Sequence, residues 1–272
     1  MTRRDLFTTA LAAPLTAYIY GRSLERHVLT TEKITLSLPH LEDELAGLRI
    51  IQISDLHLRP YTPPEFIAKT VQEVNALEPD IIAITGDFIT RDAKDAGELA
   101  DILSALKSRY GTYGVMGNHD CWHQPLKVLL ELKRGGVQML VNDGHPLLIN
   151  GAPLWIGGVD SAWAGKPDLT RALPKANDIP TILLAHEPDY ADEVIKADRH
   201  LIQLSGHSHG GQVRAPLWGE IVHVSWAKKY VCGHYDLGKV KLYVNRGIGC
   251  VSHPVRFACP PEITEITLAR EV

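Results

Sequence analysis

Cysteine is scarce in this sequence: the 272 residues include only Cys121, Cys232, Cys250 and Cys259. No two of them have the C-x-x-C spacing, so neither a thiolate zinc site nor a thioredoxin-like redox motif is indicated. Cys250 and Cys259 could form a disulfide in an exported protein, but we interpret all four as thiols. Cysteine chemistry therefore does not account for the function of this chain.

An excess of either charge is also lacking. The formal net charge is −4, the isoelectric point is near 6.3, and there are no repeats or low-complexity tracts. A chain without a broad basic field is not expected to bind nucleic acid as its main partner. With 45% hydrophobic and 22% charged residues, the chain can bury a large core and form a single α/β domain. The composition leaves the oligomeric state open.

The N-terminal apolar run is too short to span a bilayer comfortably. The uncharged stretch over residues 6–20 has about 15 residues and contains Pro14, whereas a spanning helix needs about 20. It follows Arg3 and Arg4, and this arrangement resembles a twin-arginine export signal. We assign residues 1–30 to such a signal or to an uncleaved membrane anchor; an ordinary surface helix is the third interpretation.

This N-terminus predicts where the protein acts. A signal or anchor makes the protein membrane-associated, or exported to a bacterial periplasm or cell envelope. The alternative is the cytoplasmic face of the inner membrane, which an uncleaved anchor would allow. Export after folding would let the protein load metals before transport.

Five short polar segments carry the chemistry. All but one follow an apolar run, and such runs bounded by Gly, Asp or Pro indicate buried strands. Side chains at the carboxyl ends of strands lie where open α/β folds bind ligands. Residues two apart in an extended chain face the same side. The segments are Asp55-Leu56-His57, Gly86-Asp87, Gly117-Asn118-His119-Asp120, His186 and Gly206-His207-Ser208-His209.

The pattern of apolar runs predicts a mixed α/β domain. Strands and helices alternate in the first half of the chain, and shorter strands dominate the second half. Mixed strands with flanking helices suggest two packed sheets with helices outside. The predicted helices cover residues 63–77, 95–108 and 125–134. The predicted strands cover residues 33–38, 48–54, 80–85, 112–116, 137–141, 146–149, 154–159, 181–184, 201–205, 239–245 and 263–269.

The five segments, in this order, resemble the motif series of the calcineurin-like metallophosphoesterases. The resemblance implies a four-layer α/β/β/α sandwich and a catalytic domain over residues 45–272. It also implies that Asp87 bridges two metal ions and that His119 is not a ligand. The remaining implied ligands are Asp55, His57 and His209 for one ion, and Asn118, His186 and His207 for the other.

Two-metal chemistry follows from such a ligand set. Two divalent ions that share an aspartate oxygen and a water lower the pKa of that water, so hydroxide can attack phosphorus without a protein nucleophile. His119, held by Asp120, is expected to protonate the leaving oxygen. Oxygen and nitrogen ligands suit Mn(II), which we expect, or Fe, Co or Zn. A non-catalytic, metal-stabilised binding module is the alternative from a different class.

Substrate specificity is indicated more weakly. Trp122 and His123 directly follow the Gly-Asn-His-Asp turn and are candidates to line the pocket; otherwise Trp122 caps the core. The C-terminal segments containing Arg246 and Arg256 resemble a bacterial branch that includes phosphodiesterases and UDP-2,3-diacylglucosamine pyrophosphatases. A guanidinium suits bidentate phosphate contacts, so both arginines are candidates to bind a second phosphate; otherwise they are solvated. We expect a phosphorylated small-molecule or lipid-linked substrate whose phosphodiester or pyrophosphate bond is cleaved.

Overall fold

The computed structural model describes residues 14–39, 41–215 and 217–271. Residues 14–23 are helical and lead through a 3-10 turn, η1 (Glu25–His27), into the first strand. The twin-arginine motif lies outside the described residues. Among the residues that are described, no helix is both long and apolar enough to cross a membrane.

The first sheet has six strands in the order β1-β14-β2-β3-β4-β5. β2, β3, β4 and β5 run parallel, β14 is antiparallel to β2, and β1 pairs in parallel with β14. The sheet therefore begins before residue 45, the predicted start of the catalytic domain. The bounds are β1 (Thr30–Leu38), β2 (Arg49–Ile53), β3 (Ile81–Ile84), β4 (Thr112–Gly114), β5 (Gln138–Met139) and β14 (Glu262–Arg270).

The second sheet has the order β12-β13-β9-β8-β7-β6. Its central strands β7, β8, β9 and β13 run parallel, and both edge strands are antiparallel. β8 and β9 are buried along their whole lengths, as expected for apolar strands covered on both faces. The bounds are β6 (Asp143–Ile149), β7 (Ala152–Gly158), β8 (Thr181–Leu184), β9 (Leu201–Ser205), β12 (Gly233–Leu237) and β13 (Val240–Val244).

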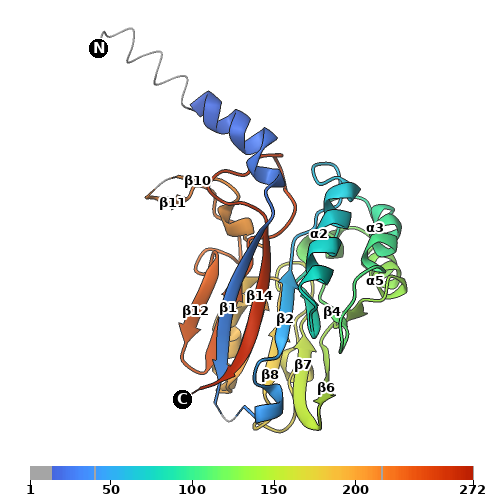
Figure 1. The fold of residues 1–272 in the computed structure, drawn as a ribbon, viewed down its shortest axis with the longest axis vertical. Helices are drawn as coiled ribbons and strands as arrows, with labels where there is room; N and C mark the ends of the chain where they lie inside the picture. The colour runs from blue at the N-terminus through green and yellow to red at the C-terminus, as the bar shows by residue number, and fades with distance from the viewer. Residues whose placement is uncertain (1–13, 40, 216, 272) are drawn as a thin grey trace.

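Three apolar clusters divide the molecule into four layers. One lies between the first sheet and the helices α2 (Pro64–Ala76), α3 (Asp95–Leu103) and α5 (Pro125–Arg134). A second joins the two sheets, and a third lies under α6 (Leu169–Ala172) and α7 (Ala191–Val194). Figure 1 shows α2, α3 and α5 on one side of the first sheet. The predicted α/β/β/α sandwich is confirmed.

Short elements connect these layers near the ends of the strands. They are η2 (Asp43–Leu45), α4 (Asn118–Trp122), η3 (Pro188–Tyr190), η4 (Ile195–Ala197), η5 (His209–Gly211) and the two-stranded hairpin of β10 (Arg214–Ala215) and β11 (Gly219–Glu220). Figure 1 places this hairpin beside the N-terminal helix. The loops after β2, β3, β8 and β9, together with α4, carry the five polar segments.

Candidate metal centre

Five of the seven candidate ligands have an unusual backbone conformation. Asp55, His57, Asp87, His207 and His209 all have positive φ angles, between 47° and 69°. Asp and His occupy this region more often than most residues, but at a cost in strain that the surrounding structure must offset. Five residues with positive φ in the loops that carry the predicted motifs indicate a functional site.

Two glycines allow the ligand-bearing loops to approach closely. A Cβ atom on Gly117 would lie 2.2 Å from Asp87 Oδ1, and one on Gly206 would lie 2.3 Å from Asp55 Oδ2. Carbon atoms do not fit at these distances. Only glycine therefore permits this packing of the backbone against the two carboxylates.

The side chains gather into clusters of metal-ligand type. Within each cluster the ligand atoms lie within 4.8 Å of one another. Two clusters group the candidate ligands as the implied division between two ions does, and a third, which contains His119, shares His57 with one of them and Asp87 with the other. The clusters are Asp55, His57 and His209; Asp87, His186 and His207; and His57, Asp87 and His119.

Asp87 links the two outer clusters, because it belongs to one of them and also lies beside His57 of the other. Its Oδ2 atom is 3.3 Å from His57 Nε2 and 3.4 Å from His186 Nε2. In the first cluster, His209 Nε2 is 3.3 Å from Asp55 Oδ1. One carboxylate oxygen thus faces ligands of both clusters, which is the position that a bridging aspartate requires.

Outer hydrogen bonds fix which ring nitrogen faces the centre. His186 Nδ1 donates to the carbonyl of Thr85 at 2.6 Å, and His207 Nε2 donates to that of Ser225 at 2.7 Å. The nitrogens left inside are His186 Nε2 and His207 Nδ1, which lie 3.2 Å apart. Such outer partners orient metal-bound imidazoles in proteins.

Unpaired buried atoms test whether the site fits metal ions. Eight buried side-chain atoms of the described residues have no hydrogen-bond partner, and three of them, His57 Nε2, His209 Nε2 and Asn118 Oδ1, lie in this site. A buried polar atom without a partner costs free energy. All three belong to predicted ligands, so bound cations would satisfy them.

The electrostatics also favour cation binding. Burial opposes ionisation of Asp87, but His186 and His57 outweigh it and hold the pKa of Asp87 well below its usual value. Burial likewise opposes ionisation of Asp55, but His209 lowers the Asp55 pKa. Both carboxylates are therefore ionised at neutral pH, the state that binds divalent ions.

The expected pairing of His119 with Asp120 is wrong. Asp120 is fully buried and accepts hydrogen bonds from the backbone N–H groups of Gly117, Phe88 and Ile89. His119 Nδ1 instead donates to the carbonyl of Thr90 at 2.7 Å. Asp120 therefore holds the loops together, and Thr90 orients the imidazole.

Aromatic side chains flank the centre on its exposed side. The ring of Trp122 is 5.0 Å from that of His119 and 5.0 Å from that of Trp163, and Trp163 is 5.6 Å from His207. Both tryptophans are partly exposed. Trp122 therefore stands beside the centre, as expected, rather than capping the core. Trp163 was not predicted, because nothing in its local sequence links it to the ligand motifs.

Glu187 fixes the position of Trp163. This buried carboxylate follows His186 and accepts hydrogen bonds from Ser161 Oγ and from the backbone N–H groups of Ala162 and Trp163. The tryptophan loop is thereby tied to a predicted ligand segment. His123 ends α4 next to Trp122, with its side chain partly exposed.

The structure corrects the two arginine predictions. Arg256 is fully buried, and its guanidinium donates to the backbone carbonyls of Gly247, Gly249 and Cys259. Arg246 is mostly buried and is paired at 2.6 Å with both Glu32 and Glu262. Neither guanidinium is free to bind a second phosphate. Both organise the C-terminal loop that packs beside His209.

Arg256→Ala is therefore expected to impair folding rather than substrate recognition. The substitution leaves several buried carbonyls without donors and opens a cavity, which together cost about 3–5 kcal/mol. In a chain of this size, thermal unfolding should fall by roughly 6–12 °C or more. Differential scanning calorimetry measures this, with exposed Arg91→Ala as the matched control. An unchanged melting temperature together with a loss confined to diester hydrolysis would restore the phosphate-binding role.

The fold and the paired ligand clusters define a binuclear metallohydrolase. A sequence model of the family described as calcineurin-like phosphoesterase matches residues 48–211. The chain belongs to this family and is a hydrolase that acts on phosphoester bonds. The predicted family membership, fold and enzyme class are confirmed.

Named relatives span nearly the whole chain. The chain is 34% identical to the uncharacterized metallophosphoesterase YkuE of Bacillus subtilis, over 98% of each chain. It is 31% identical to phosphodiesterase YaeI of Escherichia coli, over 87% of this chain and 88% of that one. It is 30% identical to the UDP-2,3-diacylglucosamine pyrophosphatase LpxG of Chlamydia trachomatis, over 94% of each.

A solved structure agrees on the fold. A dimetal phosphatase from Danio rerio matches with a TM-score of 0.50 and 11% sequence identity, covering 82% of this chain and 100% of that chain. At this identity the likeness concerns architecture alone. It supports the four-layer arrangement described above.

Proposed function

We propose that the chain is a two-metal phosphodiesterase or pyrophosphatase whose ions are Mn(II), with Fe, Co or Zn as alternatives. The observation that carries this proposal is the position of Asp87 between two ligand clusters. Asp55, His57, Asp87 and His209 would hold one ion, and Asp87, Asn118, His186 and His207 the other. When bound, two such ions lower the pKa of a water and neutralise phosphoryl oxygens.

His119 supplies the proton in this proposal. Its Nδ1 atom is engaged by the Thr90 carbonyl, so Nε2 is left for the leaving oxygen. Burial lowers the pKa of His119, an effect that Asp87 opposes. Burial thus disfavours the protonated ring, but the Thr90 contact holds the imidazole in one orientation beside the centre, so that Nε2 can deliver a proton once the ring is protonated. A purely structural metal module would have no use for an imidazole oriented in this way.

A lipid-linked UDP-sugar pyrophosphatase is the second candidate. The match to LpxG over 94% of both chains favours it. That activity would place the catalytic domain at the cytoplasmic face of the membrane. Arg3 and Arg4 with the apolar residues that follow instead support a twin-arginine signal and export to the cell envelope. We propose membrane association or export through residues 1–30.

Diesters should be hydrolysed faster than monoesters. The metal-stripped protein is assayed with each ion on bis-p-nitrophenyl phosphate and on p-nitrophenyl phosphate, and Mn(II) should give the highest diester activity.

The second aryl group of the diester can contact Trp122 and Trp163, and contacts that strengthen in the transition state raise the rate. Trp163→Ala should therefore lower kcat/KM about tenfold for the diester only, and exposed Leu126→Ala should not. Higher monoester activity in the wild type would rule out the diesterase assignment.

A further inference from the structure

An apolar groove adjoins the candidate metal centre on the side of the N-terminal helix. Its volume is about 770 Å³, within the range of small-molecule sites. His209, a predicted metal ligand, and Ser208 line one part of it. No acidic side chain lines it within the described part of the chain. Its apolar walls are formed by Ala17, Tyr18, Val213, Ile221, Val222 and Phe257.

Both walls of this groove are hydrogen-bonded to the same segment, Arg256 and Phe257. On the helix side, the backbone N–H of Arg256 donates to the carbonyl of Gly21, and a Cβ atom on Gly21 would lie only 2.5 Å from Arg256 O. On the hairpin side, the backbone N–H of Arg214 donates to the carbonyl of Phe257, and Arg214 also pairs with Glu220. The groove is thus part of the folded structure.

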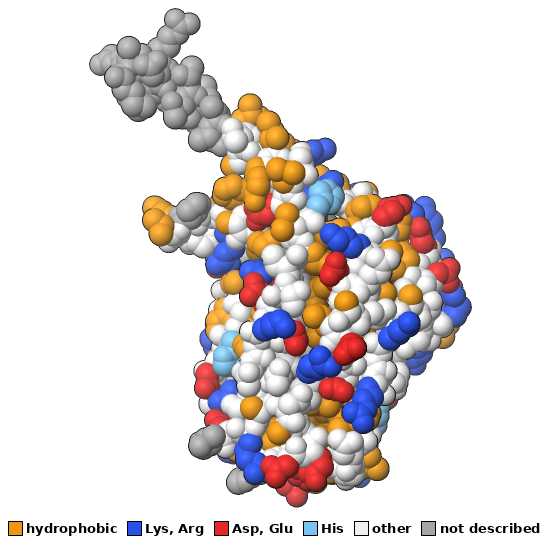
Figure 2. All heavy atoms as spheres, viewed as in Figure 1, with side chains coloured by type: hydrophobic (Ala, Val, Ile, Leu, Met, Phe, Trp, Pro, Cys, Tyr) orange, Lys and Arg blue, Asp and Glu red, His pale blue; other side chains and the backbone are white. Residues whose placement is uncertain are grey.

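The outer faces of both walls are also apolar. Leu15 and Ile19 on the helix are more than half exposed, Leu217 is fully exposed, and Trp218 is 89% exposed. Figure 2 shows hydrophobic side chains gathered over the N-terminal helix and at the tip of the neighbouring hairpin, at one end of the molecule. Exposed apolar groups concentrated in this way mark an interaction site. Aromatic and aliphatic side chains of this kind suit the interfacial region of a lipid layer.

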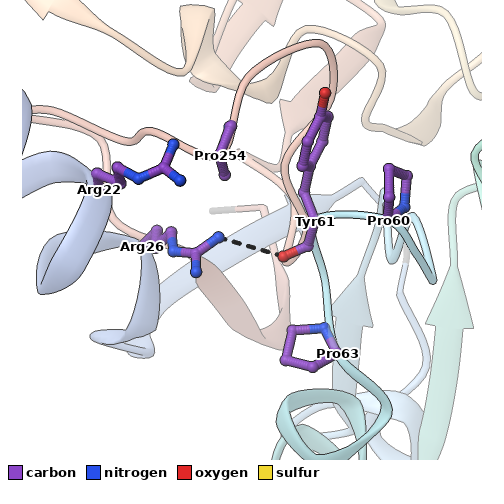
Figure 3. A pocket seen from close by; sticks show the side chains of 6 residues that line it. All are labelled: Arg22, Arg26, Pro60, Tyr61, Pro63 and Pro254. Atoms are coloured by element: carbon purple, nitrogen blue, oxygen red, sulfur yellow. Dashed lines mark hydrogen bonds between the residues drawn. The ribbon is translucent and has the colours of Figure 1, made fainter.

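Two cationic side chains, Arg22 on the N-terminal helix and Arg26 in η1, lie beside a second hollow. Arg22 and Arg26 line a separate hollow of about 470 Å³ together with Pro60, Tyr61 and Pro63, and Arg26 donates to the carbonyl of Tyr61. Figure 3 shows both guanidinium groups directed toward this hollow. None of the described residues that line it is acidic. Arginines next to an exposed apolar helix favour its contact with an anionic lipid surface.

We propose that the groove is a subsite for one hydrocarbon chain of a lipid phosphoester, with the phosphate group at the metal centre. The proposal rests on the proposed function and names its substrate class. A long hydrocarbon chain that lies between the helix and the hairpin is transferred from water to an apolar site. This site ends beside His209. The exposed apolar faces of the helix and hairpin let the groove open into the lipid layer from which the substrate is drawn.

Chain length in two matched diesters tests the proposal. Ethyl and dodecyl 4-nitrophenyl phosphate share one reacting bond and one leaving group, and dodecyl ester is used below its micelle concentration. Burial of the longer chain should raise kcat/KM roughly 10- to 100-fold in the wild type. Val222→Asp and Ala17→Trp, which charge and fill the groove, should each reduce this ratio to within about threefold of unity. Ethyl-ester turnover should stay within twofold, and Leu148→Asp, on exposed strand β6, should change neither value.

Direct binding of the fluorescent fatty acid cis-parinaric acid gives a second measurement that does not depend on turnover. We expect one bound probe per wild-type chain and at least tenfold weaker binding by both groove variants. Equal rates for the two esters in the wild type, or a chain-length preference retained in both variants, would overturn the subsite. So would absence of probe binding, which would mean that residues 1–13 or a second copy fill the groove. Failure to hydrolyse either ester with any metal, with probe binding intact, would instead contradict the proposed function.

Discussion

Asp87→Ala should lower metal-dependent hydrolysis more than about 10³-fold. The carboxylate faces ligands of both clusters at 3.3 and 3.4 Å, so in the proposed centre its loss would remove the carboxylate that the two ions share. Each ion contributes several kcal/mol of charge stabilisation in the transition state, and 1.4 kcal/mol corresponds to a factor of ten. Steady-state kinetics on a diester, together with elemental analysis of the purified protein, measure both losses.

Asp92→Ala is the matched control, because Asp92 lies in the same loop but pairs with Lys94 at the surface. It should retain wild-type metal content and turnover. Two ions per chain with near-normal turnover in Asp87→Ala would contradict the bridging assignment. If Asp87→Ala loses only one ion and has no turnover, the bridging role is supported, and one of the two metal sites depends on Asp87 more than the other.

His119→Gln should leave the metal content unchanged while turnover falls roughly 10²- to 10⁴-fold, the range for a general acid. The glutamine side chain can fill part of the space beside Thr90 but cannot deliver a proton at neutral pH. The kinetic loss should be largest for substrates with poor leaving groups, because these depend most on protonation. Turnover of alkyl and 4-nitrophenyl esters measures this difference.

His200→Gln, at an exposed position outside the clusters, serves as the control and should behave as wild type. Metal binding is the alternative role for His119, because His119 lies in a cluster with His57 and Asp87. If His119→Gln binds only one ion per chain, then His119 is a ligand and the general-acid role is wrong.

Much of the fold could be predicted because the core strands are continuous apolar runs. The predicted strands at residues 181–184 and 201–205 match β8 and β9 in both bounds. β12 was missed because its sequence, Gly-His-Tyr-Asp-Leu, lies at a sheet edge and is not apolar. Helix α3 ends at Leu103, five residues earlier than predicted. Residues 104–108 have no strong stop signal, so packing rather than sequence sets this end.

The residues that gather in the candidate site could be predicted from the motifs, but their side-chain partners could not. Neighbouring residues on a helical turn point about 100° apart, so Asp120 cannot hold the ring of His119 even though it is next in sequence. Arg256 illustrates a second limit. Its sequence context suggests an exposed phosphate ligand, and only the tertiary structure shows that its guanidinium donates five hydrogen bonds to four backbone carbonyls. Pairings that depend on chain segments far apart are not encoded in local pattern.

The most direct test of the account is metal stoichiometry measured together with activity. Chelator-treated protein is titrated with Mn(II), and bound ions are counted by elemental mass spectrometry while diester hydrolysis is followed. The account predicts an inactive stripped protein, two ions per chain at saturation, and activity that appears as the second site fills. Full activity in the stripped protein, or saturation at one ion with full activity, would contradict the binuclear centre built from Asp55, His57, Asp87, Asn118, His186, His207 and His209.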